Sequence, residues 1–255
     1  MEHFEVIDED ALAFFVEHGW LAQRGGLPVA ATVLQAWVDE VAGWPDDGAW
    51  LHYREMTDAG PKLCRSENFT PFHEGLRTLL REGSVLEAAS ALLGEPAVLY
   101  KEKVNYKLAG GAGYAPHQDA PAYRFIEQHI SCMLAVDPAT EENGCLEVVS
   151  GMHHEVLPQD DRGCIAPEVV AAMDWQPAPL EPGDVLWFHS RTPHRSGPNR
   201  TTTNRRALYP TYNALAEGDL RDAYYEQKLA EFTTKDHNPG RVQVSLIGDF
   251  EGRPV

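Results

Sequence analysis

The first third of the chain repeats hydrophobic residues at intervals of three and four, the spacing of a helix with one buried face. Three helices are predicted there: one after Asp8, one from Pro28 and one from Ser84. Acidic residues follow Asp8, proline suits a first helical turn, and Ser84 with Glu87 forms a capping-box pattern. The part of the chain up to about residue 95 is therefore predicted to be helical.

Beyond residue 95 the pattern changes to short alternating or continuously apolar stretches, which are typical of β-strands. Turn signals such as Gly110-Gly111, Asn143-Gly144 and Pro182-Gly183 separate these stretches. Helical spacing returns over residues 220–232. The strands are predicted over residues 96–108, 129–136, 145–149, 185–189 and 206–212.

Helices followed by many short strands predict the α+β class, with a mainly β core closed into a cupin-like jelly roll and helices flanking it. We expect the 255 residues to form a single domain, because one β-barrel with outer helices accommodates this length. Its parts are a helical N-terminal part (1–95), the jelly-roll core (96–215), and a C-terminal helix and tail (216–255).

The charge and hydrophobicity of the chain limit its partners. A formal net charge of −18 would repel a phosphate backbone, so we expect no nucleic-acid partner. No segment approaches the roughly 18 apolar residues that a membrane span requires, so we expect no membrane partner either. These properties favour a small-molecule substrate, handled by a monomer or a homodimer.

Cysteine usage and the N-terminal residues predict a cytoplasmic protein. No two of the four cysteines form a C-x-x-C pair, which argues against a zinc site or a disulfide framework. The first ten residues are acidic and lack the basic and apolar regions of a secretory signal.

A candidate metal site is formed by His117, Asp119 and His194. The two side chains of an H-x-D pair in a strand point to the same side, so His117 and Asp119 can hold one metal together. His194 follows the apolar stretch 185–188 and is placed to supply a third ligand. Two histidines and one carboxylate form a facial triad that leaves coordination positions open, as Fe(II) oxygenases require for O2 and a cosubstrate.

A second candidate site is an anchor for an anionic cosubstrate such as 2-oxoglutarate, whose far carboxylate needs a buried partner. Arg205 follows His194 by 11 residues and can return on an adjacent strand, and Ser196 can add a hydroxyl donor. Arg206 competes for this role, because strand alternation turns only one of the two arginines inward and the sequence leaves that choice open.

Further polar residues are candidates for binding near the metal. Lys103 and Asn105 share one face of the predicted strand 96–108 and are expected to reach the cosubstrate or the substrate. Tyr123, His189 and Arg195 are candidates for substrate recognition. Positive groups around the site of so acidic a chain would indicate an anionic substrate.

Over residues 100–212 the sequence resembles the phytanoyl-CoA dioxygenase family. The resemblance rests on the order and spacing of three motifs, which are His117-Gln118-Asp119, the stretch 142–153 beginning Glu142-Asn143-Gly144, and His194-Arg195-Ser196-Gly197-Pro198-Asn199 followed by Arg205.

The resemblance implies a double-stranded β-helix with His117, Asp119 and His194 as ligands of Fe(II). It implies that Arg205, assisted by Ser196, binds the far carboxylate of 2-oxoglutarate. The activity implied is a dioxygenase that uses O2 to hydroxylate an unactivated C–H bond of a small organic substrate, such as a phosphonate or a natural product, and releases succinate and CO2. Because Asp119 is present, hydroxylation is favoured over the halogenation carried out by relatives that lack this carboxylate.

Two other classes of protein share parts of this pattern. A cupin-like metal-dependent binding protein or isomerase would hold a metal in the same barrel without O2 chemistry, and succinate formation distinguishes it from an oxygenase. A non-catalytic sensor or scaffold is disfavoured because the triad and Arg205 are all present.

Overall fold

The computed structural model describes residues 1–123 and 126–234 of the chain, and the C-terminal tail in the sequence-predicted segment 216–255 lies mostly outside them. The described helices are α1 (Glu9–His18), α2 (Ala31–Ala42), α3 (Glu74–Arg81), α4 (Gly83–Leu93), α5 (Pro167–Val170) and α6 (Arg221–Thr234), with 3-10 turns η1 (Ala120–Ala122) and η2 (Leu215–Glu217). None of these helices combines the length and the apolar character needed to cross a membrane.

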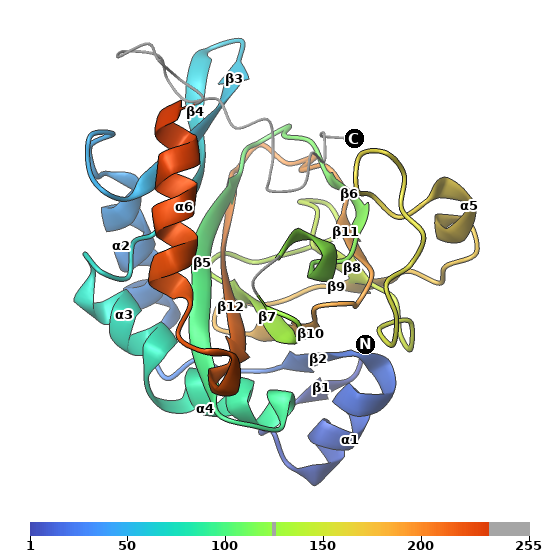
Figure 1. The fold of residues 1–255 in the computed structure, drawn as a ribbon. Helices are drawn as coiled ribbons and strands as arrows, with labels where there is room; N and C mark the ends of the chain where they lie inside the picture. The colour runs from blue at the N-terminus through green and yellow to red at the C-terminus, as the bar shows by residue number, and fades with distance from the viewer. Residues whose placement is uncertain (124–125, 235–255) are drawn as a thin grey trace.

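Two sheets make up the β structure. The strands are β1 (His3–Phe4), β2 (Trp20–Gln23), β3 (Leu51–Thr57), β4 (Gly60–Glu67), β5 (Ala97–Lys107), β6 (Tyr114–His117), β7 (His129–Ala135), β8 (Leu146–Val148), β9 (Gln176–Ala178), β10 (Val185–His189), β11 (His194–Ser196) and β12 (Arg205–Ala214). The larger sheet has the order β1-β2-β10-β7-β12-β5-β4-β3 and the smaller β6-β11-β8-β9. They form the two layers of a jelly roll, which confirms the predicted fold class (Figure 1).

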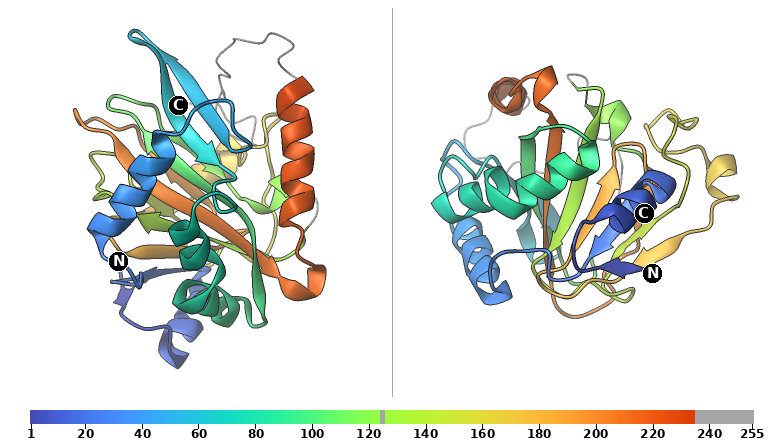
Figure 2. Two further views of the ribbon diagram at one scale, coloured as in Figure 1. Left: turned by 90° about the vertical axis from the view of Figure 1, so that its left-hand side faces the viewer. Right: turned by 90° about the horizontal axis from the view of Figure 1, so that it is seen from below.

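The outer face of the larger sheet is covered by helices α1 to α4 (Figure 2). Leu34 and Val38 of α2 and Leu76 of α3 are fully buried in one hydrophobic core with Val104 of β5 and Leu208 of β12. Burying each such side chain contributes about 1.5–3 kcal/mol, so this core fixes the sheet against its helical layer.

The inner face of the larger sheet is the face turned toward the smaller sheet. A second core fills part of the space between the sheets, where Met133 of β7 and Phe188 of β10 pack with Leu146 and Val148 of β8. Strand alternation then assigns each residue to a face: Ala207 of β12 belongs to this second core, and its neighbour Leu208 to the outer one.

The predicted strands and the C-terminal helix are found in their places, whereas the helix predicted from Pro28 begins at Ala31 and the part predicted as helical also contains β1 and β2. The helix predicted from Ser84 begins at Gly83, and its N-cap Glu82 makes no side-chain capping bond, so the predicted capping box is wrong. The helix α3 and the hairpin of β3 and β4 were not predicted, and they lie in the part predicted as helical. The hairpin shows little apolar alternation because polar residues such as Arg54, Glu55 and Lys62 occupy both of its faces.

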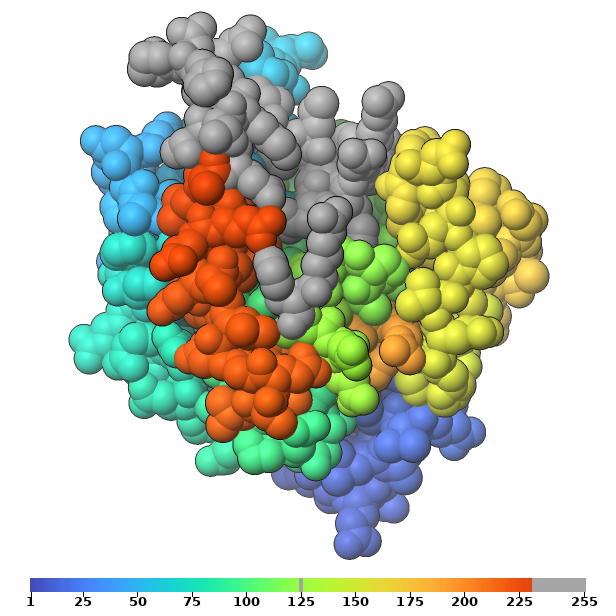
Figure 3. Space-filling view, viewed as in Figure 1, coloured from blue at the N-terminus to red at the C-terminus, as the bar shows by residue number. Residues whose placement is uncertain are grey.

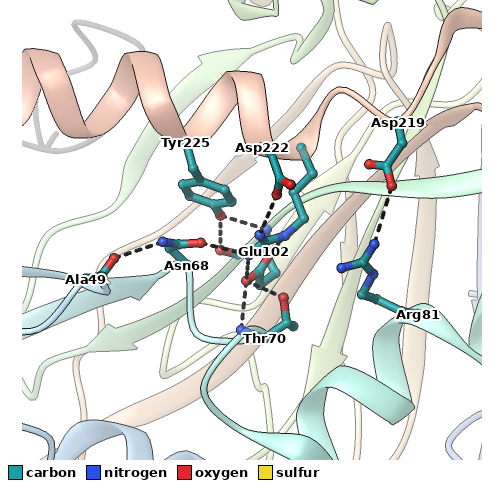
Figure 4. A network of polar contacts seen from close by, with 9 residues as sticks. Ala49, Asn68, Thr70, Arg81, Glu102, Asp219, Asp222 and Tyr225 are labelled. Carbon is teal, nitrogen blue, oxygen red and sulfur yellow. Dashed lines mark hydrogen bonds and ion pairs between the residues drawn. The ribbon is translucent and has the colours of Figure 1, made fainter.

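Helix α6 is held against the larger sheet by a buried ion pair (Figure 4). The Arg221 guanidinium donates to both carboxylate oxygens of Glu102 on β5, at 2.5 and 3.0 Å, and to Asn68 at 2.9 Å. Thr70 donates its backbone N–H and its hydroxyl to the same carboxylate. The charges of Arg221 and Glu102 are thus satisfied where α6 begins, and the helix is fixed beside β5.

Candidate active site

Three potential metal ligands converge between the two sheets. One ligand atom each of His117, Asp119 and His194 lies within 4.8 Å of the other two. His117 ends β6 and His194 begins β11, and these residues are directly paired across the smaller sheet. The triad predicted from the sequence is therefore assembled by one strand pairing and the turn that follows β6.

Asp119 reaches the site by a route other than the one predicted. Strand β6 ends at His117, and Asp119 has helical backbone angles as the residue before η1. The side chain is positioned by a neighbouring strand, because the Ser131 hydroxyl of β7 donates to Asp119 Oδ2 at 3.0 Å. Thr211 of β12 lies 2.9 Å from Ser131 and donates to it, since the Ser131 proton is used by the carboxylate.

Backbone carbonyls orient both imidazoles. His117 Nδ1 lies 2.7 Å from the oxygen of Ala115, and His194 Nδ1 lies 3.0 Å from the oxygen of Thr192. A carbonyl only accepts, so both Nδ1 atoms carry the proton and both Nε2 lone pairs are available to a metal. His194 Nε2 lies 4.0 Å from Asp119 Oδ1, the carboxylate oxygen that Ser131 does not contact.

The charge states of the triad suit a divalent cation. Burial, together with the neighbouring His194, lowers the pKa of His117 to about 3, so this imidazole is neutral. Burial alone would raise the pKa of Asp119, but the neighbouring His194, His117 and Lys103 hold it well below its usual value. The side chain is therefore an ionised carboxylate.

Arg205 lies on the inner face, buried and only partly hydrogen-bonded. It is 3% exposed, and its Nη2 donates to the Gly144 carbonyl at 3.0 Å. Within residues 1–123 and 126–234, its Nε and Nη1 have no hydrogen-bond partner. Such donors fit a carboxylate that binds two guanidinium N–H groups at once.

Arg206 points to the outer face and is fully engaged there. Its guanidinium donates to both oxygens of Asp137 at 2.8 Å and pairs with Asp39 of α2. The sequence left open which of the two arginines faces inward. In the structure Arg205 faces inward and has the unpaired donors, and Arg206 faces outward.

Lys107 is a site residue that was not predicted from the sequence. It lies opposite Arg205 in the pairing of β5 with β12, and its Nζ donates to Ser196 Oγ at 3.0 Å, to Gly144 O at 3.1 Å and to Gly197 O. Burial, together with Arg205, lowers the pKa of Lys107 to about 7. Ser196 thus lies beside this pair of cations, as expected for a residue that assists Arg205.

Three of the other predicted residues are Asn105 and Lys103, on the inner face of β5, and Tyr123, next to η1. Asn105 is buried on the inner face with its Oδ1 unpartnered, and Lys103 is close enough for its charge to lower the pKa of Asp119. Lys103 Nζ also lies 5.5 Å from the ring centre of Tyr209. Tyr123 is buried directly after η1.

His189 and Arg195 are not brought to the triad. His189 has the parity of the outer-core residue Trp187, whereas Phe188 points inward and its ring centre lies 4.8 Å from that of His194. Arg195 alternates with His194 and binds Glu147 at 2.7 Å on the other face of the smaller sheet. Strand parity, which the sequence did not fix at these positions, explains both differences.

The donor set matches a ferrous site. Two imidazoles and one carboxylate, with no fourth ligand beside them among the residues that the structure describes, make the facial triad of non-haem Fe(II) enzymes, whereas a structural zinc site is closed by four ligands. The unpaired N–H groups of Arg205 fit the far carboxylate of 2-oxoglutarate. Jelly roll and triad together define the class of non-haem iron oxygenases.

Figure 3 shows the residues around η1, in green, between α6 and the segment that leads to α5.

Comparison with known proteins agrees with this class. The sequence model of the phytanoyl-CoA dioxygenase (PhyH) family matches residues 18–207. The methylphosphonate hydroxylase of Gimesia maris is 51% identical over 225 residues, which cover 87% of this chain and 86% of that protein. The 2-aminoethylphosphonate dioxygenase of an uncultured bacterium is 40% identical over 223 residues, or 85% of each chain.

A solved structure shows the same fold. The chain superposes on EctD from S. alaskensis, crystallised with 2-oxoglutarate and 5-hydroxyectoine, with a TM-score of 0.71 and 19% identity. The matched regions cover 83% of this chain and 77% of that one.

This chain belongs to the phytanoyl-CoA dioxygenase family. It is an enzyme of the non-haem Fe(II)- and 2-oxoglutarate-dependent dioxygenases, with a His-Asp-His triad that fits Fe(II). The family predicted from the sequence motifs is thereby confirmed.

Proposed function

We propose that this enzyme hydroxylates the carbon bonded to phosphorus in a small alkylphosphonate, with methylphosphonate as the preferred substrate. The reaction takes methylphosphonate, 2-oxoglutarate and O2 to hydroxymethylphosphonate, succinate and CO2. The proposal is supported by 51% identity to a methylphosphonate hydroxylase over most of both chains.

The observation that carries the proposal is a concentration of positive charge on the inner face. The chain has a net charge of −18, yet the inward positions of β4, β5 and β12 are rich in cations. Near neutral pH 2-oxoglutarate is a dianion and an alkylphosphonate carries one to two negative charges, so a site that binds both needs several cations between its sheets. These cations are Arg65, Lys101, Lys103, Lys107 and Arg205.

The roles of the residues follow from their positions. We assign His117, Asp119 and His194 to the metal, which when bound supplies the O2 chemistry that the side chains cannot perform. We assign Arg205, with Ser196 and Lys107 beside it, to the far carboxylate of 2-oxoglutarate. Asn105 and Lys103 complete the cosubstrate side of the inner face, and Tyr123 lies on the substrate side.

We favour methylphosphonate over 2-aminoethylphosphonate because the carboxylates of the inner face that could bind a substrate ammonium group are already engaged. Glu67 is the acidic residue that β4 contributes to this face, and it is bound by Lys228 at 2.7 Å and by Arg65 at 3.4 Å. Asp119 is committed to the triad. A substrate ammonium group would therefore compete with existing ion pairs for these carboxylates.

The test is turnover of matched acids by the purified, Fe(II)-loaded protein. Methylphosphonate, 2-aminoethylphosphonate, methanesulfonate and acetate are each supplied with 2-oxoglutarate and O2, and succinate and phosphorus NMR spectra are recorded. We expect succinate and hydroxymethylphosphonate in equal amounts, with label from 18O2 in the product hydroxyl. Metal binding without succinate formation from any of these acids would support the cupin-like binding protein or isomerase instead.

Location and assembly extend the proposal. We propose a cytoplasmic enzyme, because the four cysteines are free and three of them are buried. A monomer or homodimer remains our prediction for the assembly.

A further inference from the structure

His129 is a buried histidine whose ring forms no hydrogen bond with any residue that the structure describes. It is 0% exposed, and both Nδ1 and Nε2 lack a partner. Buried polar atoms in proteins are nearly always paired, and leaving one unpaired costs roughly 1–3 kcal/mol. The other histidines at the site differ, since His117 and His194 each donate Nδ1 to a carbonyl. An unpaired ring in this position indicates a partner that arrives with a ligand.

The position of His129 on β7 turns it toward the triad. Ser131, two residues further along the strand, donates to Asp119, and alternate residues of a strand share a face. The intervening Ile130 belongs to the outer core. His129 therefore lies on the inner face beside the carboxylate ligand, and Asp119 is close enough to raise its pKa against the larger lowering effect of burial.

A cation accompanies His129. Lys101 lies opposite Thr211, which is itself paired with Ser131, so the three strands bring Lys101 to the same region of the inner face. The Tyr123 ring joins the two groups: its centre lies 4.8 Å from that of His129 and 4.1 Å from Lys101 Nζ. Lys101 is 2% exposed, so its charge acts in a region from which water is largely excluded.

This group is separate from the proposed cosubstrate anchor. Along β5, Lys101 and Lys107 are six residues apart, which corresponds to about 20 Å at ~3.3 Å per residue. Arg205 and Ser196 lie at the Lys107 end, whereas Ser131 and Asp119 lie at the Lys101 end. A single small dianion cannot reach both ends, so the two clusters suit two different anions with the triad between them.

We infer that His129 and Lys101, with the Tyr123 ring between them, form the phosphonate subsite of the enzyme. This inference rests on the proposed function. His129 donates a ring N–H to a phosphonate oxygen, Lys101 balances the charge, and the small alkyl group is thereby directed toward the triad. His129 is thus a substrate-binding residue whose missing hydrogen bonds are made by the substrate.

The experiment measures the two ligands separately, with His129→Leu as the principal variant and His129→Gln as the conservative one. Binding of methylphosphonate and of 2-oxoglutarate to the Fe(II)-loaded protein is followed by calorimetry under argon. We expect His129→Leu to weaken methylphosphonate binding at least tenfold and to change 2-oxoglutarate binding less than twofold. His129→Gln, which retains an N–H donor, should recover part of the loss.

A matched control is His52→Leu. His52 is also buried with an unpartnered Nε2, but it lies on β3 and contacts Ser66, whose hydroxyl lies 3.2 Å from the outer-core Tyr106. The His52→Leu variant should bind methylphosphonate and 2-oxoglutarate as the unmodified protein does. Melting temperatures identify any variant that is merely misfolded.

The other outcomes are distinguishable. If the unmodified enzyme hydroxylates methylphosphonate and His129→Leu binds it equally well, the subsite is wrong and the proposed function stands. If His129→Leu weakens both ligands alike, the residue is structural and the subsite is likewise wrong. If the unmodified enzyme decarboxylates 2-oxoglutarate but neither binds nor hydroxylates a phosphonate, the proposed function fails and the subsite fails with it.

Discussion

Arg205 and Lys107 lie directly opposite each other on β12 and β5, and both donate to the carbonyl oxygen of Gly144, at 3.0 and 3.1 Å. Two buried cations that share one neutral acceptor repel each other, and this repulsion adds to burial in lowering the pKa of Lys107 to about 7. An anion bound at Arg205 would relieve the repulsion. Without an anion the two cations thus lack a counter-charge, which a bound carboxylate would supply.

The first prediction is that 2-oxoglutarate binding depends on pH through Lys107. Because a bound carboxylate favours the charged lysine, binding takes up a proton above the pKa of about 7 in the free protein. The dissociation constant should rise by up to about tenfold per pH unit above pH 7, until the higher pKa of the complex is reached. Calorimetry with the Fe(II)-loaded protein in buffers of different ionisation enthalpy measures the proton uptake.

Lys107→Met provides the control for this prediction, because it removes the titrating group and keeps the aliphatic stem. The variant should bind 2-oxoglutarate more weakly at pH 7 and with little change between pH 7 and 9. Folding stability of the ligand-free protein should change with pH in the opposite direction to 2-oxoglutarate affinity. The unfolded chain holds the Lys107 proton more tightly than the folded protein does, so the free energy of unfolding should increase from pH 7 toward 10.5. An unchanged pH profile in Lys107→Met would assign the titration to another group.

The second prediction separates the two adjacent arginines. Arg205→Ala should raise the KM for 2-oxoglutarate tenfold or more, because a buried carboxylate without its partner loses several kcal/mol. Arg206→Ala should leave that KM unchanged and lower stability by about 1 kcal/mol, since its partners Asp137 and Asp39 lie toward the surface. Steady-state kinetics and denaturant titration of both variants give the comparison, and the reverse pattern would contradict the assignment.

The sequence predicted the elements whose signal is local. Strands β5, β7, β10 and β12 have strong apolar or alternating patterns, and the triad followed from a short motif and a histidine at a strand end. Residues whose role depends on another strand were not found. Nothing near Lys107 or His129 in the chain distinguishes them, because the groups they contact are distant in sequence or lie outside the strands: Gly144 and Ser196 for Lys107, and the Tyr123 ring for His129.

The sequence also did not show which face of its strand each candidate side chain occupies. His189 and Arg195 have suitable side chains and lie next to site residues, but one step along a strand turns each of them to the opposite face. Asp119 shows the converse, since it reaches the metal site although it lies beyond the end of its strand.

The third prediction concerns the support of Asp119. Ser131→Ala removes the hydrogen bond to Oδ2, so the carboxylate is less well oriented and Fe(II) affinity should fall roughly 10-fold to 100-fold. Anaerobic metal titration measures the effect. Thr211→Val is the graded comparison, because it removes only the hydroxyl next to Ser131 and should have a smaller effect. Equal metal affinity in Ser131→Ala and the unmodified protein would show that Asp119 is positioned by the backbone alone.

The fourth prediction concerns the attachment of α6. Arg221→Met leaves the Glu102 carboxylate buried without its ion pair and should lower the free energy of unfolding by about 3–5 kcal/mol. Adding Glu102→Gln to this variant should restore part of the loss, because no uncompensated charge then remains.

The exposed pair of Arg81 with Asp219, which lies nearby in Figure 4, is the matched control for this effect. Arg81→Ala should lower stability by less than about 1 kcal/mol, since exposed ion pairs are screened by water. Urea titrations of the variants give the free energies. If Arg221→Met were no more destabilising than Arg81→Ala, α6 would be held by its apolar contacts, such as those of Tyr225 with Leu51 and Tyr53, and the buried ion pair would fix only its direction.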